Sequence, residues 1–312
     1  MKLATTTSYF YSATKTQAEA VAAFEGTGFR HLDYNFYSFG RPNLPFMGDG
    51  DWMKDVRDAK AVADKLGFDF VQAHSPSNNP FDGDWDFTVK AHARSIEAAG
   101  YLGVKNIVVH SGFSQQYQYT ADRDAFFEAN KRFYDALVPA MEKTGVTVCI
   151  ENTATGNMGS MYFFRKGEEM RDFVEYFNHP LLKCCWDVGH ANMEDPDQYN
   201  DIIAMGDTLT AVHIQDNLGQ RDDHMAPFMG TLDVNAVMRG LIDGGFVSRG
   251  GVFTFEADNI LTDAGSWPNR RSDAFADKNP VPGPSLALKR KAIGFLYEIG
   301  KEILEGYGLY ED

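Results

Sequence analysis

The sequence predicts an α/β protein, a single (β/α)8 TIM barrel that spans residues 1–312. Three observations predict this fold. Short apolar runs typical of β-strands alternate eight times with segments of helical character, which indicates a parallel sheet with helical crossovers. Seven of the apolar runs end in His, Asp or Glu, as expected where a barrel gathers functional side chains at the carboxyl ends of its strands. No Gly-rich phosphate fingerprint follows the first strand, which disfavours the alternative, an open doubly wound sheet.

The predicted strands are short runs of β-branched and other apolar residues, bounded by Gly, Pro, Asn, Asp or Ser. In chain order they are Lys2–Thr7, Phe29–Asn35, Phe68–Ala73, Lys105–Val109, Val146–Ile150, Leu181–Trp186, Leu209–Ile214 and Gly251–Phe255. A helix is expected after each of them. The first helix, Thr16–Gly26, has a capping threonine at its start and a glycine at its end. The others are Asp51–Leu66, a helix from the Asn78–Asp86 loop through Ala99, Asp122–Lys143, Arg165–Phe177, Asp197–Met205, Val234–Gly244 and Ser285–Leu304.

Three loops lack helical periodicity and are expected to determine specificity: Phe36–Gly50, Ser114–Tyr119 and Asp258–Gly283. Aromatic residues at or just beyond the strand ends predict a mouth that stacks on the apolar faces of a sugar. They are Tyr34, Phe36, Tyr37, Phe113, Trp186 and Trp267, and for Trp186 a place in the core is an equally good interpretation.

Composition restricts the classes of partner. The formal net charge of −15 argues against nucleic acid, because phosphate contacts need clustered Lys and Arg. The three cysteines, Cys149, Cys184 and Cys185, lie in apolar runs with no zinc-module spacing, which predicts reduced thiols and a cytoplasmic protein. No signal-peptide pattern opens the sequence, and no apolar run approaches the ~20 residues that span a bilayer, so no membrane association is expected.

A metal site is predicted where four consecutive strands end. Glu151, Asp187, His213 and Glu256 follow the fifth to eighth strands, and in a barrel these ends are neighbours on one rim. Clustered carboxylates repel one another unless a cation lies between them. Mixed oxygen and nitrogen ligands suit a divalent ion, with Mn²⁺ preferred and Mg²⁺, Co²⁺ or Zn²⁺ as alternatives.

Further polar residues follow other strands. His74 and His110 end the third and fourth strands, and either could hold a substrate hydroxyl. His190 lies three residues after Asp187, so its ring could reach over the site, although a helix N-terminal residue without a ligand role is the simpler interpretation. Asp222 and His224 are two residues apart and could point the same way, or belong to a solvated loop.

These segments together carry a resemblance to a known family. Glu151-Asn152-Thr153-Ala154, Asp187-Val188-Gly189-His190-Ala191-Asn192, Ala211-Val212-His213-Ile214-Gln215-Asp216-Asn217 and Arg221-Asp222-Asp223-His224 resemble the xylose-isomerase-like TIM barrels, the AP endonuclease family 2 superfamily. The resemblance extends from His74 to Glu256. That superfamily includes sugar isomerases, ketose 3-epimerases, hydroxypyruvate isomerases, inosose-processing enzymes and the endonuclease IV repair nucleases.

The resemblance to the ketose epimerases implies a role for each residue of the central set. Glu151, Asp187, His213 and Glu256 match their single-metal site, and Glu151 and Glu256 would also form the acid/base pair. His190 matches a ligand of a substrate oxygen. Arg221 matches a substrate-binding arginine, although its spacing from His213 is longer.

The resemblance to the repair nucleases implies a different metal content. Their trinuclear zinc site has nine ligands, and this sequence has a candidate for each: His74, His110, Glu151, Asp187, His190, His213, Asp222, His224 and Glu256. Sugar-processing members of the superfamily keep several of these histidines, so the set does not by itself indicate three zinc ions.

The function expected is that of a metal-dependent sugar isomerase or epimerase, acting on a ketose or keto-polyol through a metal-stabilised enediolate with Glu151 and Glu256 as acid and base. A lyase or dehydratase on a keto-sugar or keto-inositol could use the same site. An abasic-site endonuclease with three zinc ions ranks lower, and a non-catalytic sugar-binding barrel is a further alternative. The expected partner is a small sugar, preferably unphosphorylated, and a homo-oligomer is left open.

Overall fold

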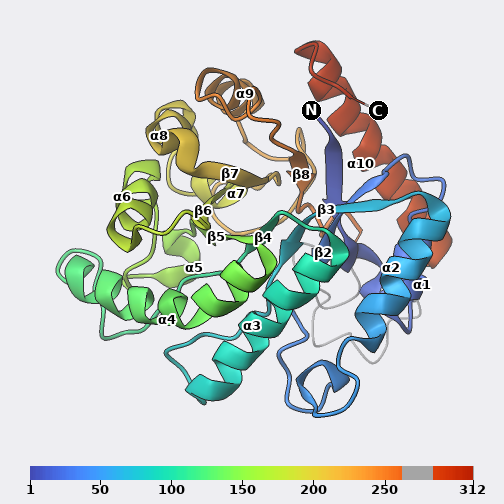
Figure 1. The fold of residues 1–312 in the computed structure, drawn as a ribbon. Helices are drawn as coiled ribbons and strands as arrows, with labels where there is room; N and C mark the ends of the chain where they lie inside the picture. Colours follow the sequence, from blue (N-terminus) through green and yellow to red (C-terminus); the bar gives the residue numbers. More distant parts are fainter. Residues whose placement is uncertain (262–283, 312) are drawn as a thin grey trace, which may run out of the picture.

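In the computed structural model, which describes residues 1–261 and 284–311, the strands form a nearly closed parallel barrel surrounded by helices (Figure 1). The described residues contain eight strands in the order β7-β6-β5-β4-β3-β2-β1-β8. They are β1 (Leu3–Thr6), β2 (His31–Asn35), β3 (Asp69–His74), β4 (Asn106–Val108), β5 (Thr147–Glu151), β6 (Leu182–Asp187), β7 (Leu209–His213) and β8 (Phe253–Phe255). The (β/α)8 prediction is confirmed.

The ring closes between β7 and β8 just beyond the end of β7. Ile214 forms a parallel bridge with Phe255, and its amide donates to the Thr254 carbonyl at 2.8 Å. The amide of Glu256 donates in turn to the Ile214 carbonyl at 3.0 Å. This closure places His213 and Glu256 on adjacent strand ends, as the barrel prediction requires.

The helices follow the predicted alternation, with shifted ends. They are α1 (Gln17–Ala22), α2 (Lys54–Leu66), α3 (Trp85–Leu102), α4 (Arg123–Thr144), α5 (Thr155–Met158), α6 (Gly167–Phe177), α7 (Val188–Asn192), α8 (Tyr199–Met205), α9 (Val234–Asp243) and α10 (Leu286–Gly306), with 3-10 turns η1 (Thr7–Ala13), η2 (Pro45–Met47) and η3 (Gly206–Thr208). No periodicity in the sequence predicted η1, η2, α5, α7 or η3, because one or two turns are too short to show a period. No helix in residues 1–261 or 284–311 is long and apolar enough to cross a membrane.

The alternation of side chains along β2 corrects one prediction. Asp33 points into the barrel, so the next residue, Tyr34, points outward into the layer between strands and helices. Tyr34 is completely buried, and its ring packs against Phe36 at 4.6 Å and Phe70 at 5.3 Å between centroids. The prediction that Tyr34 and Phe36 line the mouth is therefore wrong, because both rings belong to the hydrophobic core.

The last helix, α10, packs closely against the barrel wall at one glycine. A Cβ atom at Gly300 would lie 2.6 Å from a ring carbon of Phe255 and 2.7 Å from a methyl carbon of Leu3. The absence of a side chain therefore lets α10 approach β1 and β8. Gly306, in the last turn of the same helix, is exposed and would meet nothing within 4 Å.

These two glycines form a matched pair for a stability test. Gly306→Ala should leave stability unchanged or raise it by up to about 1 kcal/mol, because alanine is the better helix former. Gly300→Ala should instead lower stability by up to about 2 kcal/mol, because overpacking costs ~1–3 kcal/mol and the helical gain offsets only about 1 kcal/mol of it. Urea unfolding followed by circular dichroism measures both, and equal effects of the two substitutions would contradict the close packing of α10.

Candidate active site and metal centre

A cavity of about 580 Å³ opens at the carboxyl ends of the strands. Its size lies within the range of ~300–1,000 Å³ that is usual for small-molecule sites. The side chains around it come from all parts of the ring, and they include Asn35, His74 and Glu151 at the ends of β2, β3 and β5, and His110 and Glu256 just after β4 and β8. A cavity therefore lies at the face where the site is predicted.

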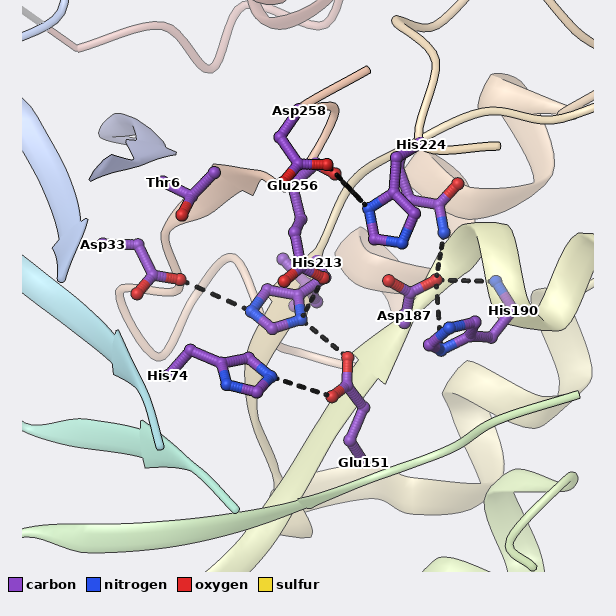
Figure 2. A network of polar contacts seen from close by, with 12 residues as sticks. Thr6, Asp33, His74, Glu151, Asp187, His190, His213, His224, Glu256 and Asp258 are labelled. Atoms are coloured by element: carbon purple, nitrogen blue, oxygen red, sulfur yellow. Dashed lines mark hydrogen bonds and ion pairs between the residues drawn. The ribbon is translucent and has the colours of Figure 1, made fainter. Parts of the chain in front are cut away.

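The central group of the site consists of Glu151, Asp187, His213 and Glu256. One ligand atom from each lies within 4.8 Å of the others. The Nδ1 atom of His213 lies 2.6 Å from Glu151 Oε1 and 3.1 Å from Glu256 Oε2 (Figure 2). Glu151 and Glu256 line the cavity, whereas Asp187 and His213 are completely buried beneath it.

A second group lies on the β3–β4 side of the centre and shares Glu151. The Nε2 atoms of His74 and His110 are 3.1 Å apart, and His110 Nε2 is 3.1 Å from Glu151 Oε2. His74 Nε2 lies 3.7 Å from the same oxygen. Two imidazoles and a carboxylate thus point their ligand atoms at one place.

A third group lies on the other side, where α7 and the loop after β7 meet. Asp222 receives His190 Nε2 at 2.9 Å on one carboxylate oxygen and His224 Nε2 at 3.2 Å on the other. Asp187 is the N-cap of α7, and its Oδ1 accepts the amide of His190 at 2.6 Å. The strand-end aspartate therefore fixes the start of the helix that carries His190.

The outer histidines are held with their Nε2 lone pairs toward the carboxylates. The Nδ1 atoms of His74, His190 and His224 face the carbonyls of Ser75, Asn152 and Glu256 at 2.8, 2.9 and 2.7 Å. A carbonyl only accepts, so each Nδ1 carries a hydrogen. In a neutral imidazole this leaves Nε2 as an acceptor facing another acceptor, a conflict that either a proton or a metal ion resolves.

Without a metal, the protons take this place. Burial lowers the pKa of His190, but Asp187 and Asp222 outweigh burial and raise it to about 10. At His224, burial likewise lowers the pKa, but the neighbouring Asp222 outweighs burial. The pKa of His224 therefore lies well above its ordinary value. For Glu256, burial raises the pKa and the neighbouring His213 outweighs it, which lowers the pKa to about 2. The metal-free site is thus a network of charged imidazoles and carboxylates.

The donor set fits a divalent cation. Asp187 Oδ2 and Glu151 Oε2 are buried without a hydrogen-bond partner among the described residues. Buried carboxylate oxygens are costly unless something pairs with them, and carboxylate and imidazole are ligands that Mn²⁺, Mg²⁺, Co²⁺ and Zn²⁺ all accept. The residues that could hold such an ion are the central group, and the two outer groups offer further places.

Two amide side chains that the sequence analysis did not assign hold the site together. Asn152 accepts the amide of Asp187 at 2.7 Å and donates to its carbonyl at 2.9 Å, which locks β5 to β6. Gln215 donates from Nε2 to Asp187 at 3.2 Å and to Asp222 at 2.7 Å. A Cβ on Gly189 would lie 2.1 Å from Cδ of Gln215, so a side chain there would displace the Gln215 amide from Asp187 and Asp222. Asn152, Gly189 and Gln215 all lie in the sequence segments that resemble the family motifs, and this position was the one signal in the sequence that could have identified them.

Some of the residues predicted to contact the substrate line the cavity, and others do not. Phe113 and Tyr37 line the cavity, together with His74, His110 and His190. Trp186 is completely buried, and its Nε1 donates to Gln198 at 2.9 Å, so it belongs to the core. Arg221 is exposed and is not among the cavity-lining side chains. The prediction that it contacts the substrate is therefore wrong for this structure. Trp267 and nearly all of the predicted loop Asp258–Gly283 lie outside the described residues.

All nine residues with a proposed metal role come together in these three groups. The family model described as xylose isomerase-like TIM barrel matches residues 23–271. This chain belongs to the xylose isomerase-like TIM barrel family. The match covers the strand ends of all the groups, from β2 to β8.

Solved structures similar to this xylose isomerase-like barrel share its fold over nearly the whole length. A D-tagatose 3-epimerase-like protein has a TM-score of 0.69 at 16% identity, covering 99% of this chain and 100% of that one. D-Psicose 3-epimerase from Clostridium cellulolyticum H10 has a TM-score of 0.71 at 19% identity, covering 97% and 99%. The 3-keto-D-glucoside 4-epimerase YcjR from E. coli has a TM-score of 0.66 at 17% identity, covering 96% and 99%. At these identities the likeness establishes the fold.

The chain spans about half the length of the curated relatives it matches. An uncharacterized protein, y4fM of Sinorhizobium fredii, is 27% identical over 147 residues, which are 47% of this chain and 46% of that protein. The Probable endonuclease 4 of Mesomycoplasma hyopneumoniae is 24% identical over 185 residues, which cover 55% of this chain and 62% of that protein.

The raised pKa of His190 predicts how the metal-free protein responds to pH. A folded-state pKa of about 10, above the ordinary 6.5, contributes stability that is complete below pH 6.5 and is lost as the pH rises toward 10. In chelator-treated protein, the melting temperature should therefore fall more between pH 6.5 and 10 for the parent than for His190→Gln. Thermal unfolding followed by circular dichroism measures this. His179→Gln, at a histidine remote from the cavity, is the control and should behave like the parent. Parallel curves for parent and His190→Gln would refute the interpretation.

Proposed function

We propose that this protein is a divalent metal-dependent sugar isomerase or epimerase that acts beside the carbonyl of a ketose or keto-polyol. One observation supports this most: Glu151 and Glu256 belong to the candidate metal group and are also its two members that line the cavity. A substrate in the cavity would therefore meet two carboxylates next to the cation. The sugar epimerases among the solved structures with this fold are consistent with the proposal.

The proposed ion would be held by Glu151, Asp187, His213 and Glu256, with Mn²⁺ preferred and Mg²⁺, Co²⁺ or Zn²⁺ as alternatives. When bound, it supplies Lewis-acid stabilisation for the negative charge that develops on the substrate oxygens. The completely buried Asp187 and His213 have no access to the cavity, so their part is to anchor the site.

The two glutamates are suited to proton transfer. Burial opposes ionisation of both, but the histidines around them outweigh burial, and the pKa of Glu151 is lowered well below its ordinary value while that of Glu256 falls to about 2. In the metal-free chain both are therefore ionised at neutral pH, the form in which a carboxylate can act as a base. Return of a proton to the opposite face gives an epimer, and return to the neighbouring carbon gives an isomer.

Polar side chains around the cavity are suited to hydroxyl groups. Burial lowers the pKa of His110 to about 4, so this imidazole is neutral at physiological pH and can bind a hydroxyl. His74 and His190 line the same cavity, with Asn35 and Thr153. Phe113 and Tyr37 add apolar surface of the kind that stacks on sugar rings.

Proton transfer by the glutamates predicts the effect of neutralising them. In Mn²⁺-loaded protein, Glu151→Gln and Glu256→Gln should each lower solvent-deuterium uptake beside the carbonyl by about 10²–10⁴-fold, the usual share of a general acid or base. NMR of a panel of ketoses and inososes in D₂O measures the exchange. Glu168→Gln makes the same change on the surface of α6 and should have no effect.

Exchange that persists in both glutamine variants would rule out the proposed pair. No exchange with any substrate while metal is bound would count against an isomerase or epimerase altogether. Product analysis in the same assay separates reprotonation from loss of a β-leaving group, which would indicate the lyase or dehydratase alternative.

A second candidate function, an abasic-site nuclease, is supported by the three ligand groups and by the similarity to an endonuclease 4. The net charge of −15 is unfavourable for a DNA-binding face. We expect no incision of an abasic-site duplex by zinc-loaded protein, and we expect His224→Ala to leave deuterium exchange within about tenfold of the parent. Elemental analysis of both proteins reports the metals per chain. Incision together with three metals per chain, both lost in His224→Ala, would favour the nuclease.

Cellular location and assembly remain predictions. Cys149, Cys184 and Cys185 are buried free thiols, and burial raises the pKa of Cys149 to about 12 and of Cys184 to about 12. Inert reduced thiols are consistent with the proposed cytoplasmic location. The proposed partner is a small sugar, and we propose no binding to nucleic acid or to a membrane. A homo-oligomer remains open.

A further inference from the structure

A buried aspartate lies beneath the central group, on the side opposite the glutamates. Asp33 on β2 is 1% exposed, and its Oδ2 lies 3.4 Å from Nε2 of His213 on β7 (Figure 2). The same oxygen accepts a hydrogen bond from Gln72 Nε2 at 3.2 Å. Among the described residues, Asp33 Oδ1 and His213 Nε2 have no hydrogen-bond partner. None of the roles considered so far accounts for this carboxylate.

The position of Asp33 is built into the sheet. The pairing of β2 with β3 shifts register between Leu32 and Asp33, so that Asp33 lies opposite Gln72 rather than opposite Val71. Such irregularities bend a strand locally and redirect its side chains. On one side of the ring, β1 and β8 separate β2 from β7, so the contact between Asp33 and His213 crosses the interior of the barrel.

The two nitrogens of His213 face different partners. Nδ1 faces Glu151 and Glu256, the side where the proposed cation would lie, and Nε2 faces Asp33. A histidine that binds metal through Nδ1 needs its hydrogen on Nε2, and the partner of that hydrogen fixes the tautomer and the orientation of the ring. Asp33 is the acceptor in that direction.

We propose that Asp33 is a positioning residue for the central metal site: it accepts the Nε2–H of His213 and so holds the Nδ1 lone pair toward Glu151 and Glu256. The inference rests on the proposed metal. The outer histidines support it by contrast, since His74, His190 and His224 each give their ring hydrogen to a backbone carbonyl. His213 has a carboxylate instead, which makes the imidazole a stronger ligand.

The cost of burying Asp33 also indicates a role beyond stability. A buried carboxylate with only a side-chain amide as hydrogen-bond donor is unfavourable for folding. Gln72 donates a hydrogen bond to Oδ2 of Asp33, whereas Oδ1 of Asp33 accepts no hydrogen bond from the described residues. A carboxylate retained in this setting is expected to serve the site above it.

The test measures metal affinity rather than turnover. Metal-free parent and Asp33→Asn are titrated with Co²⁺ against a chromophoric chelator, and the visible spectrum of bound Co²⁺ reports the ligand geometry. We expect Asp33→Asn to weaken Co²⁺ binding by about 10–100-fold and to change that spectrum, as loss of such a partner of a ligand does. Asp201→Asn is the control, because Asp201 accepts the Gly167 amide far from the cavity and should alter stability alone.

A second measurement needs no substitution. In zinc-loaded parent with ¹⁵N-labelled histidine, His213 should show a hydrogen on Nε2, protected from exchange and hydrogen-bonded. The proposal is overturned if that hydrogen is on Nδ1, or if Asp33→Asn binds Co²⁺ within about twofold of the parent while only its melting temperature falls. A parent that binds no divalent ion overturns the metal proposal first and this inference with it, so the two failures are distinguishable.

Discussion

Negative charge gathered in a low-dielectric interior is the constraint on which this structure depends. Glu151, Asp187 and Glu256 approach one imidazole at the barrel mouth, and Asp33 approaches it from below. Carboxylates this close cannot remain ionised together without positive charge among them. In the metal-free chain the positive charge comes from protonated imidazoles, whose pKa values are raised at His190, His213 and His224. The divalent cation proposed above would supply positive charge at the same place as those protons.

Neutral and structural polar groups keep the charged ones in place. Asn152 ties the end of β5 to the end of β6, and Gln215 joins the central group to Asp222. Asp216 accepts the amides of Asn217, Gly230 and Leu232, which folds the loop after β7 back on itself. That loop carries Asp222 and His224, the latter with a positive φ of 48°. The third group therefore depends on a loop fixed by one buried carboxylate.

The barrel, and the convergence of the central candidate ligands at its rim, could be predicted from the sequence because both depend on local patterns. A strand that ends in Glu151 or His213 puts that side chain on the rim whatever the exact register. Orientation decided the outcome at two aromatic residues. Tyr34 follows the inward-pointing Asp33, so its ring points outward and the predicted place at the mouth was wrong. Trp186 precedes the inward-pointing Asp187, and its burial agrees with the core position that was one of its two interpretations. The position of Asp33 opposite Gln72 depends on a register shift, and no residue pattern in β2 or β3 signals it. Arg221 lies outside the cavity lining, and its spacing from His213 in the sequence does not reveal this because a loop has no fixed period.

A second register shift, between Cys184 and Cys185 where β6 meets β7, brings Asp187 level with His213. Together the two shifts mean that the central group is set by the sheet, while much of the cavity wall comes from connecting segments, which contribute Tyr37, Asn79, Phe113 and Met158. Chemistry and recognition are thereby assigned to separate parts of the chain. Substrate range can diverge in evolution through insertions in those segments while the reacting centre stays the same. Libraries for altered specificity should accordingly vary the loops and leave every strand length untouched.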